Sequence, residues 1–147
     1  MSAFYRKDER IHIRTSPRAQ QYLQHGKVML AYAHGDVINM KRFAGLIPSA
    51  EPAMWAATEY RYGRIGHWHK RAQVAVDEFP GIVVETLPTL AAPEAYAAER
   101  GFLSGRAMVA SLFSGTWGLR AKLERGVIEL QRRLADLQLK STETKGA

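Results

Sequence analysis

Two apolar segments of this chain each run into a short loop that carries histidine, and this pairing constrains the fold more than any other feature. The segment Lys27–Tyr32 leads into a loop with His34, and the segment Arg61–Ile65 leads into a loop with His67 and His69. In extended backbone, residues i and i+2 point the same way, so the last two imidazoles can face one small volume. The pattern predicts two strand ends that present three imidazoles, which is typical of a metal site.

The amino-acid composition narrows the chemistry of such a site. The 147 residues contain no cysteine, so a disulfide framework and a thiolate zinc finger are both excluded. A length of this order predicts one domain. The net charge of +7 suits a polyanionic partner such as nucleic acid, although a basic chain is common without one. No apolar run reaches the length of a membrane span and no signal-peptide pattern is visible, so we expect a cytoplasmic protein without a membrane partner.

Alternating and β-branched runs predict the strands of the fold. We expect strands at Arg10–Thr15, Val28–Tyr32, Arg61–Ile65 and Arg106–Phe113, and a β-hairpin formed by Gln73–Glu78 and Ile82–Leu87.

Helices are predicted between these strands and at the C-terminal end. We expect helices at Ala50–Tyr60, with Ser49 as the N-cap, and at Pro93–Arg100. Apolar residues repeat at four-and-three spacing from Leu119 to Leu137, which favours a helical seam, but Gly126 interrupts the seam. Leu119–Arg125 can therefore be a last strand, and the helix is expected from Val127 to Leu139. The predicted class is mixed α/β, with one domain at 1–125 followed by a helix and tail at 126–147.

The order of these elements and their motifs resembles a known family. The motifs HGD at 34–36, GHWHK at 66–70, LPTL at 87–90 and EAYAAERGF at 94–102 are similar to the C-terminal half of calcineurin-like metallophosphoesterases. The resemblance runs from about Arg10 to Leu119 and is strongest to the phage and prophage branch described as DNA-repair-exonuclease-like. It implies half of a β-sandwich with flanking helices.

The resemblance also implies a set of site residues. His34 and His67 would share one divalent metal, such as Mn, Zn, Ni or Fe, and His69 would bind a second. Gly35, Asp36 and Gly66 would shape the loops or support the ligands from the second shell. Basic residues near the motif would contact phosphate or nucleic acid, and these are Arg64, Lys70 and Arg71.

The chain departs from the family in its acidic motifs. The D-x-H, GDxxD and GNHD motifs of the family's first half are absent from the sequence. A carboxylate bridge normally offsets the repulsion between two close cations, so three neutral imidazoles predict one bound ion or none. Three alternatives stay open. The chain is a partial phosphodiesterase or exonuclease that needs a complementing half, an inactive phage-derived binding or regulatory protein on the same half fold, or a nonfunctional remnant.

Half of a sandwich would leave an apolar face without cover. We therefore expect either a homodimer or a complex with an N-terminal-half polypeptide, because exposed apolar patches and open sheet edges favour association. The candidate residues for this face are Val28, Leu30, Val74, Val76, Ile82 and Val84.

Overall fold

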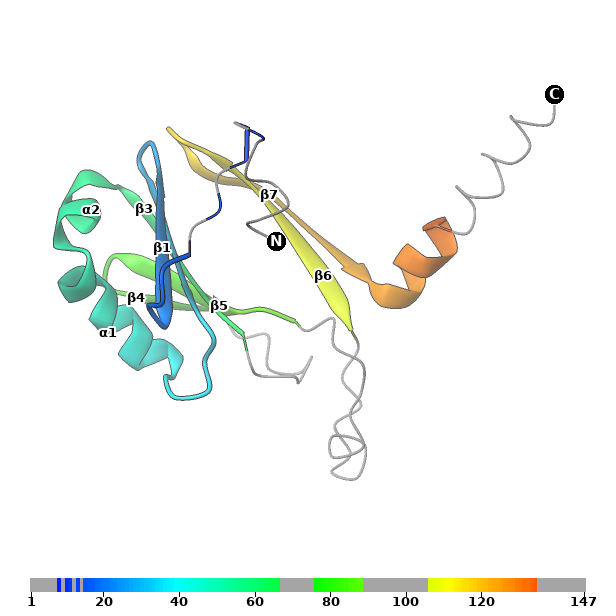
Figure 1. Cartoon of the computed structure of the whole chain (residues 1–147), viewed down its shortest axis with the longest axis horizontal. Helices are drawn as coiled ribbons and strands as arrows, with labels where there is room; N and C mark the ends of the chain where they lie inside the picture. Colours follow the sequence, from blue (N-terminus) through cyan, green and yellow to red (C-terminus); the bar gives the residue numbers. More distant parts are fainter. Residues whose placement is uncertain are drawn as a thin grey trace.

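The fold consists of two sheets with two helices packed on the larger sheet. The computed structural model describes residues 8, 10–11, 13, 15–66, 76–88 and 106–134. A five-stranded sheet has the strand order β1-β2-β3-β5-β4, and a separate two-stranded sheet is formed by β6 and β7. Helices α1 and α2 lie on one side of the larger sheet, and the β6–β7 hairpin lies on the other (Figure 1). The predicted mixed α/β class is thereby confirmed.

Most predicted strands are present with nearly the expected bounds. The elements in chain order are β1 Gln20–His25, β2 Val28–Ala33, α1 Met40–Ala50, α2 Pro52–Ala57, β3 Tyr60–Ile65, β4 Val76–Phe79, β5 Ile82–Thr86, β6 Ala107–Ser114 and β7 Gly118–Gly126. A helix follows at residues 127–134, as expected. The segment 119–125 is a strand and not the first part of a helical seam, so the strand alternative is confirmed. The described residues of 10–15 form no strand, and the helix predicted at Pro93–Arg100 lies outside the described residues.

The helix predicted at Ala50–Tyr60 is present as the shorter α2, Pro52–Ala57, and the longer α1, which begins at Met40, precedes it. Asn39 is the N-cap of α1, and its side chain accepts a hydrogen bond of 2.9 Å from the backbone N–H of Arg42. The predicted cap Ser49 lies inside α1 instead, and the backbone leaves the helical region at Glu51 before α2 starts. Tyr60, expected to end a helix, pairs with Val28 in the sheet. No helix in the described part of the chain is long and apolar enough to cross a membrane.

The order and direction of the strands bring three strand ends to one edge of the sheet. Strand β2 runs parallel to β3, and β3 runs parallel to β5, whereas β1 and β4 are antiparallel neighbours at the two outer positions. Because parallel strands end on the same side, the carboxyl ends of β2, β3 and β5 share one edge. This is the edge at which both histidine loops begin.

The main core lies between the sheet and α1. Phe43 and Ile47 of α1 are fully buried against Met29, Ile65 and Val84 of the sheet. The expectation that Val28, Leu30, Ile82 and Val84 form an exposed apolar face is wrong, because each of these side chains is at most 6% exposed. The α1 helix and the second sheet cover them. Val76 is exposed, and Val74 lies outside the described residues.

The β6–β7 hairpin packs on the opposite face of the sheet through aromatic and glycine contacts. The rings of Tyr62 and Phe113 lie 5.1 Å apart between centroids, and the backbone N–H of Leu119 donates to the Tyr62 hydroxyl at 2.9 Å. Gly118 has a φ of +71°, and a Cβ there would come within 2.7 Å of the Tyr62 hydroxyl oxygen. Glycine is therefore required for the tight approach of the two sheets.

We predict that Phe43→Ala lowers the free energy of unfolding by about 3–5 kcal/mol, because it leaves a cavity in the densest part of the core. Urea denaturation followed by circular dichroism measures this change. Val37→Ala is the control, because the Val37 side chain is 75% exposed and its truncation leaves no buried cavity. Equal effects of the two substitutions would contradict the placement of the core.

Candidate functional site

The register of β2 and β3 places the start of the 34–36 loop and Gly66 side by side. Ala33 pairs with Ile65 at the ends of the parallel strands, and the backbone N–H of Gly66 donates to the Ala33 carbonyl at 3.2 Å. His34 is the residue after Ala33, and Gly66 is the residue before His67. The two motifs that lie 30 positions apart in sequence therefore start at the same point of the sheet edge.

Two glycines hold these loops in contact. Gly35 has a φ of +95°, and a Cβ there would lie 2.2 Å from Cγ2 of Ile65 and 2.9 Å from the carbonyl oxygen of Gly66. A Cβ on Gly66 would lie 3.3 Å from the carbonyl oxygen of His34 and 4.0 Å from its Nδ1 atom. The imidazole of His34 is thus next to the backbone that leads into His67. Gly35 needs glycine for its positive φ and close contacts, whereas Gly66 does not have a positive φ and its contact is only moderately tight.

The structure describes only part of the predicted ligand set. His34 and Asp36 are exposed on the loop that follows β2. His67, His69, Lys70 and Arg71 lie outside the described residues. Within the described ranges, no group of three or more His, Asp or Glu side chains could hold a metal ion. The three-histidine site therefore stays a prediction.

The described residues do not form a metal site by themselves. His34 and Asp36 are of residue types that bind divalent metals such as Zn, Ni, Mn or Fe, but the other predicted ligands lie outside the described residues.

Arg64 lies in a different environment from the one predicted. Its side chain is 5% exposed and projects from β3 toward the β6–β7 hairpin, where its guanidinium forms an ion pair with Glu85 of β5. Its Nη2 atom lies 3.3 Å from the hydroxyl of Ser111, and its guanidinium carbon is 5.8 Å from the centroid of the Phe113 ring. The predicted contact with phosphate stays untested, but in this structure the side chain joins the two sheets.

Glu85 is the centre of a buried charge cluster. Its second carboxylate oxygen lies 3.0 Å from the Nζ atom of Lys122 on β7, so one carboxylate serves two cations. Burial lowers the pKa of Arg64 from its usual range, and burial together with the nearby Arg64 charge lowers the pKa of Lys122. Each cation depends on this carboxylate for its charge balance. In the sequence, a charged residue within the β-branched run Ile82–Thr86 is the signal that could have pointed to this charge cluster.

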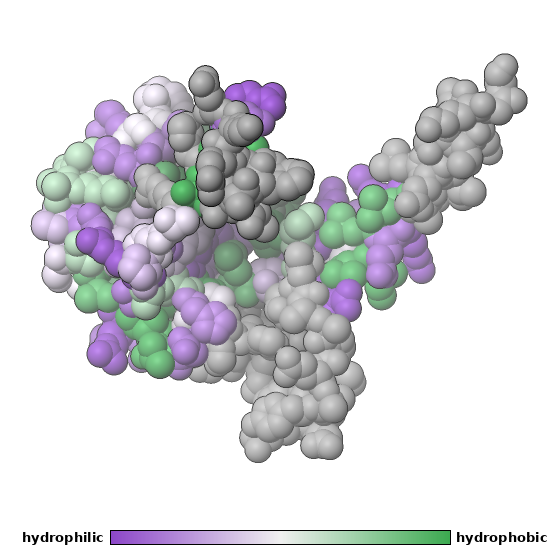
Figure 2. Space-filling model, viewed as in Figure 1, coloured by the Kyte–Doolittle hydropathy of each residue, from purple (hydrophilic) through white to green (hydrophobic). Residues whose placement is uncertain are grey.

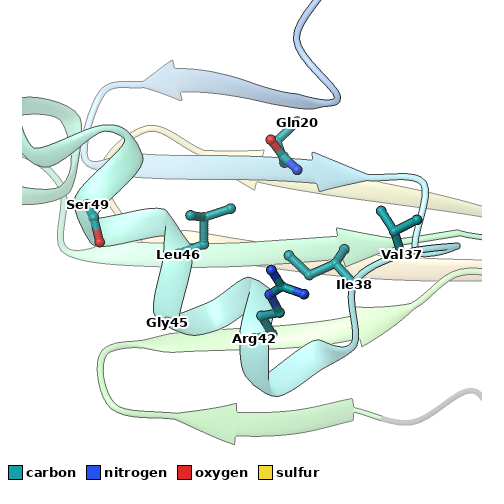
Figure 3. A pocket seen from close by; sticks show the side chains of 7 residues that line it. All are labelled: Gln20, Val37, Ile38, Arg42, Gly45, Leu46 and Ser49. Atoms are coloured by element: carbon teal, nitrogen blue, oxygen red, sulfur yellow. The ribbon is translucent and has the colours of Figure 1, made fainter.

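Arg42, a basic residue that the sequence analysis did not single out, lines a cavity near the start of α1. A cavity of about 370 Å³ opens between β1 and α1, and Arg42 extends into it with Val37 and Leu46 beside it (Figure 3). Val37 follows the 34–36 loop directly, and Gln20, which also lines the cavity, pairs with Ala33. Arg42 is thus a candidate to contact an anion. The sequence did not indicate the position of Arg42, because this position depends on the residue at which α1 begins.

Comparison of the chain with protein-family models, with curated protein sequences and with solved structures finds no match. A functional proposal for this chain therefore rests on its motifs and on the geometry of the sheet edge.

We predict that Glu85→Gln lowers the free energy of unfolding by about 3–5 kcal/mol, because it leaves the buried Arg64 charge without its partner. Lys122→Met should cost less than about 1 kcal/mol, since the ammonium is partly exposed and Arg64 keeps its ion pair. Urea denaturation at neutral pH measures both values.

A double variant separates charge pairing from packing. Replacing both Arg64 and Glu85 with apolar residues of similar size should recover most of the stability that Glu85→Gln removes, because no unpaired buried charge then remains on β3 or β5. Equal losses for Glu85→Gln and Lys122→Met would argue against a desolvated Arg64–Glu85 pair.

Proposed function

We propose that this chain is a partial calcineurin-like metallophosphoesterase of the phosphodiesterase or exonuclease type, which contributes the histidine side of a composite active site. The observation that carries the proposal is the contact between the 34–36 loop and Gly66, which brings the HGD motif and the start of the GHWH motif to one sheet edge. Gly35 is required at this contact by its positive φ and by the close approach of Ile65. The half-sandwich architecture is part of the same proposal.

Three histidines of the chain would hold the metal. His34 on the loop after β2 and His67 and His69 on the loop after β3 supply neutral imidazole nitrogens, and Asp36 supports the loop from the second shell. A bound divalent ion, such as Mn, Zn, Ni or Fe, would lower the pKa of a coordinated water and neutralise charge on a phosphate oxygen. In this proposal His34, His67 and His69 would hold that ion.

Basic residues would hold the substrate near this edge. Arg42 extends into the cavity beside the 34–36 loop, and Lys70 and Arg71 directly follow the GHWH motif in sequence. Together with the net charge of +7, they favour a phosphodiester or another anionic phosphate ester over a neutral substrate. Arg64 is less available for this role than Arg42, because its guanidinium is buried in an ion pair with Glu85.

The acidic ligands would come from a second polypeptide. No D-x-H, GDxxD or GNHD motif occurs in the chain, so it has no carboxylate in the sequence context that bridges two metals. A complementing half that carries these motifs would complete the site at the shared edge of β2, β3 and β5.

A second candidate function is a binding or regulatory protein that keeps the fold without the reaction. The observation that favours it is the buried cluster around Glu85, which makes the two sheets a cohesive unit without any metal. Macromolecular binding without hydrolysis, even with a complementing half present, would support this candidate over the first.

We predict that His34→Ala and His67→Ala each weaken binding of Zn²⁺ or Ni²⁺ at least about tenfold, because each removes one imidazole ligand. Isothermal titration calorimetry of the purified chain measures the affinities. His25→Ala is the matched control, since His25 pairs with Val28 at the opposite end of the sheet. A similar loss in the control would contradict a site at the histidine edge.

We also predict that the chain alone hydrolyses bis-p-nitrophenyl phosphate with Mn²⁺ no faster than Mn²⁺ without protein, because the bridging carboxylate is missing. Release of p-nitrophenolate measures the rate. Robust turnover that disappears in His67→Ala would show that this chain, or a second copy of it, supplies the missing ligands.

A further inference from the structure

The outer face of the β6–β7 hairpin is apolar and uncovered. Ser111 and Lys122 pair across the hairpin and point toward the larger sheet, where they meet Arg64 and Glu85. Alternation along the strands places the adjacent pairs on the opposite face. The apolar side chains of that face are Met108, Ala110, Leu112, Ala121 and Leu123. Leu112 is 64% exposed and Leu123 is 57% exposed.

This face belongs to an arm that extends away from the body of the protein. The far end of β6–β7 and the helix at 127–134 project from the rest of the fold (Figure 1), and hydrophobic residues lie among hydrophilic ones along the arm (Figure 2). The helix adds Ile128 and Leu134, which are 67% and 59% exposed. Exposed apolar side chains gathered on one face are typical of a contact surface.

Large and small residues are arranged on this face so that two copies of the face can complement each other. Ala110 pairs with Leu123, and in the next row of the same face Leu112 pairs with Ala121, so large and small side chains alternate diagonally. A two-fold axis parallel to the strands would place β6 of one copy over β7 of the other at the same level. Each leucine then lies over an alanine of the partner copy, and each row fits without a clash or a void.

The charges on the face also allow a second copy. Among the paired residues of this face, Arg125, opposite Met108, carries a charge, and its Nε atom lies 3.1 Å from a carboxylate oxygen of Glu129. Arg120 has no cross-strand partner at the bulge between Leu112 and Phe113, beside this face. The ion pair of Arg125 with Glu129 reduces the like-charge repulsion between two copies of the face. With this axis, the helices that follow Gly126 in the two copies leave the interface at the same height along the strands. Their exposed apolar residues are then available for further contact.

From these observations we propose that the outer face of β6–β7 is the interface of a homodimer in which two hairpins pack face to face about a two-fold axis parallel to the strands. This proposal does not depend on the proposed enzymatic function. It places the partner on the arm and leaves the edge with His34 open to a complementing polypeptide.

Light scattering of the full chain at micromolar concentration tests the assembly. We expect a mass of twice 16.5 kDa, and we expect Leu112→Lys or Leu123→Lys to raise the dimer dissociation constant at least about tenfold. Trp117→Lys is the matched control, because Trp117 is 65% exposed in the hairpin turn and lies off this face, so this variant should stay dimeric. A 16.5 kDa monomer, or a dimer insensitive to both lysine substitutions, would overturn the proposal.

A double-variant cycle tests the axis itself. Ala110→Leu alone would oppose two leucines, Leu123→Ala alone would oppose two alanines, and both should weaken the dimer. The combined variant exchanges the large and small positions of one row and should restore dimerisation to within about threefold of the original chain, because the row is again complementary. Circular dichroism confirms that each variant is folded. Losses that simply add in the combined variant would exclude this two-fold arrangement.

Discussion

The parallel pairing of β2 with β3 is the constraint on which the rest of the structure depends. It requires a crossover, which α1 and α2 provide, and that crossover supplies the side chains that bury one face of the sheet. The same pairing aligns the carboxyl ends of two strands, so that Gly35 meets Ile65 and Gly66. The main core and the candidate site therefore have a common origin in one register.

The second face of the sheet is organised by charge as well as by apolar contact. Glu85 offsets two cations that come from different sheets, and Tyr62 contacts both Phe113 and the backbone of Leu119. Such a cluster contributes to a specific orientation of the hairpin because a shifted hairpin would leave a buried charge unpaired. The inner face of β6–β7 is thereby held against the body while its outer face stays open.

Two features of the molecule are incomplete in different ways, and they lie in different places. The histidine motifs at one sheet edge occur without the acidic motifs of the family they resemble, so the proposed metal site would take its acidic ligands from a chemically different partner. The β6–β7 arm has an apolar surface whose pattern complements itself, so a second copy satisfies it. Both requirements can be met at once, because the interface on the arm does not use the loops that follow β2 and β3.

The sequence by itself determined the mixed class and most of the strands, because alternation and turn residues are local signals. It also placed the 34–36 loop and Gly66 at strand ends, and the structure brings these two together. It did not determine the start of α1, where the Asn39 cap and the burial of Phe43 and Ile47 outweighed the Pro and Ser signals near residue 49. Only the tertiary structure decided that Arg64 is buried and that Leu112 and Leu123 are exposed. Those outcomes depend on which face of each strand meets another sheet, and residues distant in sequence set that contact.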